Sequence, residues 1–145
     1  MSLHGEYDNQ NIFAQIIRGD APCYKLYEDD DVLAFLDVFP QSFGHTLVIP
    51  KRSAARNILE VDTQALAKVM AVVQTLTRVI VDELEPAGVQ IAQFNGAPAG
   101  QTVFHIHMHI VPRYAGEGLG IHASEKADAA QLQQLQARLV KRLNG

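Results

Sequence analysis

The chain has 145 residues, of which 48% are hydrophobic and 19% are charged, and its formal net charge is −4. This composition is typical of one globular domain and excludes an intrinsically disordered chain. It holds no basic excess of the kind that marks nonspecific nucleic-acid binding or a polybasic membrane anchor. We therefore expect neither a nucleic acid nor a membrane as a partner.

The single cysteine, Cys23, excludes an intrachain disulfide and is typical of a reducing compartment. The first residues lack the basic and apolar regions of a secretory signal. No apolar run approaches the ~20 residues that are needed to span a bilayer. The sequence thus predicts a cytoplasmic protein.

The first predicted elements are a helix, a hairpin and a strand. Apolar residues at helical spacing predict a short helix over residues 11–18, which Gly19 and Pro22 end. Strands over 24–27 and 32–36 flank an acidic turn and predict a hairpin. A third strand is expected over 45–49. An apolar stripe then predicts the longest helix, over 63–84, with Asp62 as its N-cap.

Strands over 89–94 and 102–111 and a helix from about residue 128 complete the predicted elements. Because strands and helices do not alternate strictly, these elements indicate an α+β fold with an antiparallel sheet of five strands. We interpret residues 1–145 as a single domain, with a core over 11–114 and a C-terminal loop and helix over 115–145. Residues 116–123 fit either a solvent loop or a flap over a site.

Three histidines alternate with apolar residues near the end of the predicted sheet: His105, His107 and His109. On one strand, alternation would place all three imidazoles on the same face and the apolar residues on the other. Two chemistries suit such a cluster, namely a zinc site and nucleophilic catalysis by one imidazole. The preceding Gly100-Gln101-Thr102 offers an amide, a hydroxyl and backbone N–H groups, which suit a phosphate better than zinc.

Residues 105–111, His-Ile-His-Met-His-Ile-Val, resemble the His-x-His-x-His-x-x signature of histidine-triad (HIT) nucleotide hydrolases and transferases, in which x is apolar. Segments 11–22, 27–37, 44–51 and 100–104 resemble further parts of the family pattern, in the family's order. The chain is most similar to compact bacterial members of the histidine-triad nucleotide-binding branch. The resemblance implies a HIT-like fold, with a five-stranded antiparallel sheet, a long helix and shorter terminal helices, and a homodimer.

The same resemblance implies a role for each matching residue. His107 would be the nucleophile that attacks the α-phosphorus, His109 would contact phosphate oxygens, and Asp37 would hold the ribose hydroxyls. His105 would support the nucleophile without contacting the substrate, and His45 would pack beside the triad. The other implied nucleotide-binding residues are Gln101, Thr102 and Asn95 near the phosphate and leaving group, and Ile12, Phe13, Ile16, Phe35 and Val38 around the base.

The chain departs from the family pattern at several positions. Many bacterial relatives carry a zinc-binding Cys-x-x-Cys at the positions of Asn11 and Ala14, so we predict no structural zinc. We also predict no cofactor, since the triad and backbone donors can carry the phosphate charge. Phe94 stands where the family often has an amide. His109 stands where the transferase branch has glutamine, which favours hydrolysis.

The leading hypothesis is a hydrolase that acts at the α-phosphate of purine nucleoside phosphoramidates or related nucleotide conjugates, through a nucleotidyl intermediate on His107. A dinucleoside polyphosphate hydrolase would use the same residues and would differ only in the leaving group. A nucleotide-binding or scaffold protein with vestigial turnover is a third hypothesis, and a metal-binding protein is a fourth.

Overall fold

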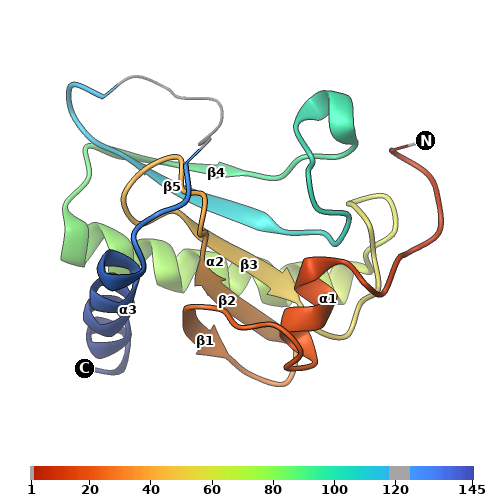
Figure 1. Ribbon diagram of the computed structural model, residues 1–145, viewed down its shortest axis with the longest axis horizontal. Helices are drawn as coiled ribbons and strands as arrows, with labels where there is room; N and C mark the ends of the chain where they lie inside the picture. The colour runs from red at the N-terminus through yellow and green to blue at the C-terminus, as the bar shows by residue number, and fades with distance from the viewer. Residues whose placement is uncertain (1, 118–124) are drawn as a thin grey trace.

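The computed structural model describes residues 2–117 and 125–145, which form one five-stranded antiparallel sheet with helices on both faces (Figure 1). The strands are β1 (Lys25–Glu28), β2 (Val32–Leu36), β3 (Thr46–Pro50), β4 (Gly88–Ala92) and β5 (Met108–Arg113). Their order across the sheet is β1-β2-β3-β5-β4, so β5 lies between β3 and β4. The helices are α1 (Ile12–Ile17), α2 (Thr63–Leu84) and α3 (Ala129–Asn144), and a 3-10 turn covers Ala97–Ala99. The predicted α+β fold is confirmed.

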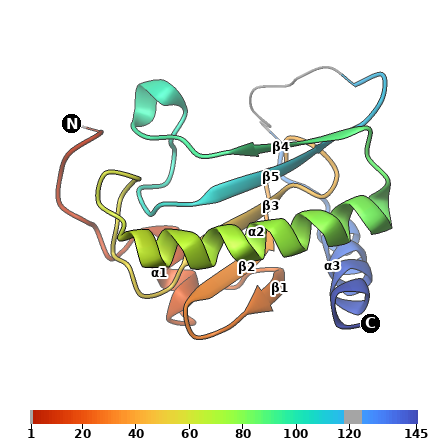
Figure 2. The same cartoon turned by 180° about the vertical axis from the view of Figure 1, so that it is seen from behind.

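Two hydrophobic clusters hold the helices to the sheet. On one face, α2 and α3 bury apolar side chains against the strands, and Figure 2 shows α2 running along that face. On the other face, Phe13 of α1 packs with Leu33, Phe35, Leu47 and Ile49. Helices therefore cover both faces of the sheet. The short helix α1 covers only part of its face and leaves the rest open for a site.

Helix α2 has the predicted bounds, and Asp62 caps it by accepting a hydrogen bond from the Ala65 N–H at 3.1 Å. Its 22 residues are long and apolar enough to cross a membrane, so the expectation that no such segment exists is wrong. In this fold the stripe Val69, Val73, Leu76 and Ile80 is buried in the core. The outward side keeps apolar residues exposed, among them Met70.

The last strand is shorter than predicted. β5 begins at Met108, whereas alternation predicted a strand from about residue 102. The segment before it does not pair with a neighbouring strand, and the Ile106 N–H donates instead to the carbonyl of Ala55, which lies in a loop. The triad is therefore split, with only His109 on a strand and the other two histidines in the segment that leads into it.

Helix α3 starts after Asp128, as predicted, and Asp128 accepts a hydrogen bond from the Gln131 N–H at 3.1 Å. Leu132, Leu135 and Leu139 join the same core cluster as α2. The Ala127 N–H donates to the Val38 carbonyl at 2.9 Å, which ties the start of α3 to the loop after β2. Of the segment 116–123, for which a loop and a flap were both considered, residues 118–123 lie outside the described residues.

Candidate active site

A cavity of about 860 Å³ opens between α1, the ends of β2 and β3, and the two histidines His107 and His109. Its wall contains all five apolar residues that were predicted to surround a base: Ile12, Phe13, Ile16, Phe35 and Val38. It also contains His45, His107, His109, Asp37 and Thr102. The fold thus brings ten of the thirteen predicted site residues to one cavity, with apolar groups and titratable groups on a shared wall.

The imidazole of His107 is held in one tautomer. Its Nδ1 lies 2.7 Å from the His105 carbonyl oxygen, which can only accept, so Nδ1 carries the proton. Burial, together with a smaller effect of the neighbouring His109, lowers the pKa of His107 to about 3. Phe13 presses edge-on against the ring, with centroids 4.9 Å apart. At neutral pH His107 therefore has a free lone pair on Nε2, and no hydrogen bond joins that atom to another described residue.

His45 and His109 form a chain whose protons can also be assigned. The Gln41 N–H donates to His45 Nδ1 at 2.9 Å, so the proton of neutral His45 lies on Nε2. That Nε2 lies 2.9 Å from His109 Nδ1 and donates to it. His109 must then carry its own proton on Nε2, a buried atom with no partner in the described part of the chain. His109 thus presents an unused N–H donor beside His107, with ring centroids 4.8 Å apart.

These assignments need neutral rings, and burial provides them. Burial, together with smaller effects of the nearby Arg113 and His107, lowers the pKa of His45 to about 4. Burial lowers the pKa of His109 to about 4, with a smaller contribution from His45. A cluster of uncharged imidazoles is the arrangement that a nucleophilic nitrogen and a neutral hydrogen-bond donor require.

His105 does not line the cavity. Its Nε2 donates to the Pro50 carbonyl at 2.9 Å, and its Nδ1 accepts from the Tyr7 hydroxyl at 2.6 Å. Burial lowers its pKa, and the Pro50 carbonyl opposes that shift. With only 1% of its surface exposed, His105 acts on the site through its carbonyl, which accepts the His107 proton.

Asp37 follows β2 and faces His45. The Asp37 N–H donates to the His45 carbonyl at 3.0 Å, and one carboxylate oxygen lies 3.5 Å from His45 Nε2. The other oxygen accepts from the Phe39 N–H at 2.8 Å. Burial raises the pKa of Asp37 to about 6, and the Phe39 N–H opposes that rise. Asp37 lines the cavity and keeps lone pairs for two further donors.

Two predicted nucleotide contacts lie outside the cavity wall. Gln101 is 2% exposed; its oxygen accepts from the Gly96 N–H, and its amide nitrogen donates to the Arg56 and Val103 carbonyls. Asn95 accepts from the Ile58 N–H and pairs with Gln93. Both amides bind neighbouring loops and lie outside the cavity wall, although the Asn95 amide keeps one N–H that no described group accepts; their contacts with a nucleotide stay a prediction.

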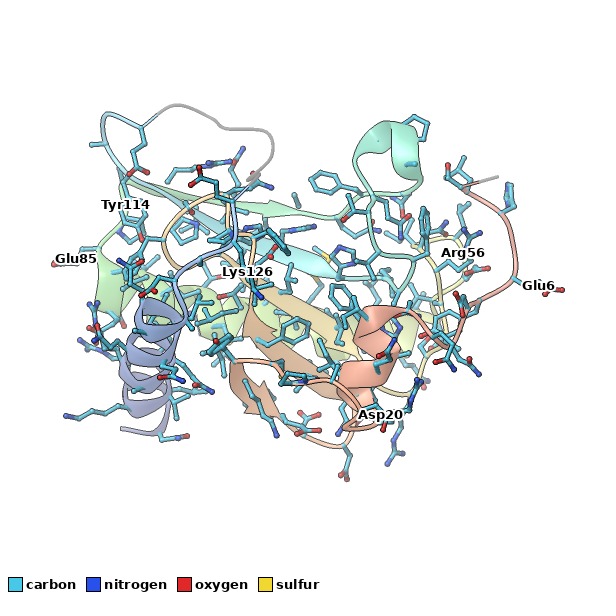
Figure 3. The ribbon with its side chains drawn as sticks, in the orientation of Figure 1. Glu6, Asp20, Arg56, Glu85, Tyr114 and Lys126 are labelled. Carbon is cyan, nitrogen blue, oxygen red and sulfur yellow. The ribbon has the colours of Figure 1, made fainter. Side chains whose placement is uncertain are left out.

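Three residues near the site were not predicted to act there. Phe94 lines the cavity and packs on His109, with ring centroids 5.0 Å apart. Lys126 is the one lysine or arginine on the wall within the described ranges 2–117 and 125–145 (Figure 3). Tyr7 reaches His105 across 98 positions in the sequence. No local pattern could reveal the last two, because tertiary packing alone brings them to the site.

Asp37, His45 and His109 are close enough to hold a metal ion, since one ligand atom from each lies within 4.8 Å of the others. Their hydrogen bonds argue against this. A metal needs a lone pair on each imidazole, whereas His45 uses its only one to accept from Gln41, and His109 uses its own to accept from His45. The donor set does not fit a metal while these bonds exist.

We therefore predict that the purified protein carries no stoichiometric zinc and that EDTA leaves its turnover unchanged. The neutral imidazoles and the free His109 N–H would carry the phosphate charge without an ion. Elemental analysis and assays before and after chelation check this. One zinc per chain, together with loss of turnover on chelation, would contradict the prediction.

The chain is similar to known proteins over most of its length. "Protein hit" of Bacillus subtilis is 44% identical over 136 residues, which cover 91% of this chain and 93% of that relative. An adenosine 5′-monophosphoramidase of Schizosaccharomyces pombe is 42% identical over 111 residues, which cover 76% of this chain and 80% of that relative. The crystal structure of a Hit-like protein from Bartonella henselae superposes with a TM-score of 0.87 at 40% identity, covering 94% of this chain and 99% of that one. The HIT domain family model matches residues 18–116, and the chain therefore belongs to the HIT family.

Proposed function

We propose that the protein is a nucleotide hydrolase that acts at the α-phosphate of purine nucleoside phosphoramidates or related conjugates. The observation that carries this proposal is the tautomer of His107, whose free Nε2 lone pair lies in the wall of a cavity beside an unused N–H donor. The monophosphoramidase from Schizosaccharomyces pombe, a relative at 42% identity, supports the same reaction class.

The proposed reaction has two displacements. His107 Nε2 forms a bond to the α-phosphorus while the bond to the leaving amine breaks, and the amine takes a proton from water. The nucleotidyl-imidazolium keeps its Nδ1 proton, which the His105 carbonyl accepts. Water then attacks phosphorus, loses a proton and releases the mononucleotide with His107 restored.

The proposed phosphate contact is His109. Its Nε2–H has no partner among the described residues and is buried, so a phosphate oxygen would supply the missing acceptor. Thr102 adds a hydroxyl to the same wall, and Lys126 adds a positive charge. The apolar part of the wall then takes the flat base, for which we propose a purine.

Asp37 is proposed to accept both ribose hydroxyls. Replacing Asp37 by alanine should weaken ribonucleotide binding by about 1.5–3 kcal/mol, because a charge-assisted hydrogen bond is lost. Substrates without the 2′ and 3′ hydroxyls should show little of this effect. Calorimetric titration with both nucleotide types checks this, and equal losses for the two would show that Asp37 is structural.

The pH profile gives a second test of Asp37. Its carboxylate takes up a proton as the pH falls through about 6, whereas His107 stays neutral down to about 3. The acid limb of kcat/KM for ribonucleotides should therefore follow Asp37 and lie near pH 6. It should disappear in Asp37→Asn, whose amide does not titrate.

The leaving group distinguishes the proposed function from the alternatives. Adenosine phosphoramidate, diadenosine polyphosphates and UDP-sugars should be assayed side by side. The proposal expects the highest kcat/KM with the phosphoramidate. A preference for diadenosine polyphosphates would support the second hydrolase, and tight binding without turnover of any substrate would support a scaffold.

We also propose a homodimer. β4 is an edge strand of the sheet, and Ile91 on it is 41% exposed. Met70 and Val81 of the neighbouring α2 leave similar fractions exposed. Exposed apolar groups on an edge strand and on a long helix favour pairing with a second copy. Sedimentation equilibrium would distinguish a dimer from a monomer.

A further inference from the structure

The backbone that orients His107 lies outside the sheet. Because β5 begins only at Met108, the segment just before it lacks the ladder of hydrogen bonds that fixes a strand. Outside the sheet ladder, residues 102–107 make one backbone hydrogen bond to the rest of the described chain, from the Ile106 N–H to the Ala55 carbonyl at 2.9 Å. The carbonyl of His105 therefore needs another means of support.

The side chain of His105 supplies that support from both ring nitrogens. Nε2 donates to the Pro50 carbonyl at the end of β3, at 2.9 Å. Nδ1 accepts from the Tyr7 hydroxyl at 2.6 Å, and the two rings meet edge to face with centroids 5.7 Å apart. The Pro50 carbonyl can only accept, so the His105 proton lies on Nε2, and the Tyr7 hydroxyl donates to the remaining lone pair on Nδ1 and fixes the orientation of the ring.

Tyr7 lies in an N-terminal arm, residues 3–8, and hydrogen bonds anchor both ends of this arm to the rest of the protein. At one end the Leu3 carbonyl accepts from the buried Asn57 amide at 2.8 Å. At the other end the Asp8 carbonyl accepts from the backbone and side-chain amides of Asn11, the N-cap of α1. Glu6 points away from the body of the protein (Figure 3), so the arm is anchored through its carbonyls and Tyr7.

The arm also passes very close to Arg56. A Cβ atom at Gly5 would lie 2.5 Å from Arg56 Nη1, and Gly5 has a φ of +156°. Arg56 is 8% exposed and stacks over the ring of Phe104, 4.8 Å from its centroid. A larger residue at position 5 would have to displace the Arg56 guanidinium, so glycine fits the contact between the arm and Arg56.

We propose that Tyr7 is a positioning residue for the nucleophile. It acts through His105, whose carbonyl holds the Nδ1 proton of His107 and so keeps the Nε2 lone pair directed to substrate. This inference rests on the proposed role of His107. Tyr7 does not line the cavity, so it affects the reactivity of the nucleophile and not the affinity for the nucleotide.

Tyr7→Phe tests this, because it keeps the aromatic ring and removes only the hydroxyl. We expect the rate of nucleotidylation in single turnover to fall about tenfold, with nucleotide binding changed less than twofold. The matched control is Tyr27→Phe, which removes a surface hydroxyl that donates to Asp29 at 2.7 Å, outside the cavity wall. Tyr27→Phe should leave the rate unchanged.

The ¹⁵N signals of the His107 ring give a readout that a merely structural role would not change. In the wild type they should show a protonated Nδ1 and an unprotonated Nε2, and in Tyr7→Phe a mixture of both tautomers. An unchanged tautomer signal in Tyr7→Phe would overturn the proposal, whether or not the rate falls. Because this measurement needs no substrate, it tests Tyr7 independently of the proposed hydrolysis.

Discussion

Replacing His107 by alanine is expected to lower turnover by several orders of magnitude while leaving the affinity for a mononucleotide almost unchanged. The substitution removes the Nε2 lone pair that forms the bond to phosphorus. The apolar base wall, Asp37 and His109 all remain, and these supply the proposed binding contacts. Single-turnover kinetics and calorimetric titration with the mononucleotide product measure the two effects separately.

Variants of the neighbouring histidines should change turnover and nucleotide affinity in other proportions than His107→Ala does. His109→Ala should reduce both binding and turnover, because His109 Nε2–H is the proposed phosphate donor. His105→Ala should reduce turnover less than His107→Ala, because its backbone carbonyl remains, but at least as much as Tyr7→Phe, because the whole ring that supports this carbonyl is lost. Tyr27→Phe, which lies outside both the cavity wall and the N-terminal arm, serves again as the control. Near-normal turnover in His107→Ala would contradict the assignment of the nucleophile.

The free energy of unfolding is expected to fall by several kcal/mol as the pH drops from about 6.5 to 4. His45 and His109 have folded-state pKa values of about 4 and His107 about 3, below the ordinary value of 6.5. The unfolded chain therefore takes up these protons first, and each unit of difference corresponds to about 1.4 kcal/mol. Stability is fully present above pH 6.5 and is lost as the pH falls toward the folded-state values.

Asp37 should raise the free energy of unfolding, rather than lower it, over part of the same pH range. Its folded-state pKa of about 6 lies above the ordinary value of 3.8, so the folded protein takes up this proton first and gains stability between those values. One such group offsets only part of the effect of three histidines. Urea unfolding at pH 7 and pH 4.5 measures the net change, and His109→Gln, which removes one titrating ring, should reduce it. A free energy that is constant between these pH values would contradict the buried, neutral triad.

The elements that the sequence predicts best are those whose ends carry a clear signal, such as an N-cap or a polar turn. Helix α2 has an N-cap at Asp62 and a buried stripe on one side, and its predicted bounds agree with the structure. Strand β2 also has its predicted bounds, between an acidic turn and Asp37. In these elements local propensity and tertiary packing favour the same conformation.

The sequence could not predict where β5 starts, because the alternation of histidine and apolar residues continues from the loop into the strand. The same alternation results whether the backbone pairs with a strand or, as at Ile106, with a loop carbonyl, so the pattern does not show where the strand begins. The amides of Gln101 and Asn95 show a related limit, since the same group that binds a phosphate also binds backbone. Only the packed structure shows which partners they have.

A rapid chemical quench of the wild-type protein with an adenosine phosphoramidate substrate tests the central claim most directly. Our account predicts a covalent nucleotidyl adduct, labile in acid and stable in base, on the peptide that contains His107. His107→Ala should form no adduct under the same conditions. Turnover by the wild type with no trapped adduct, or an adduct on another residue, would contradict the account.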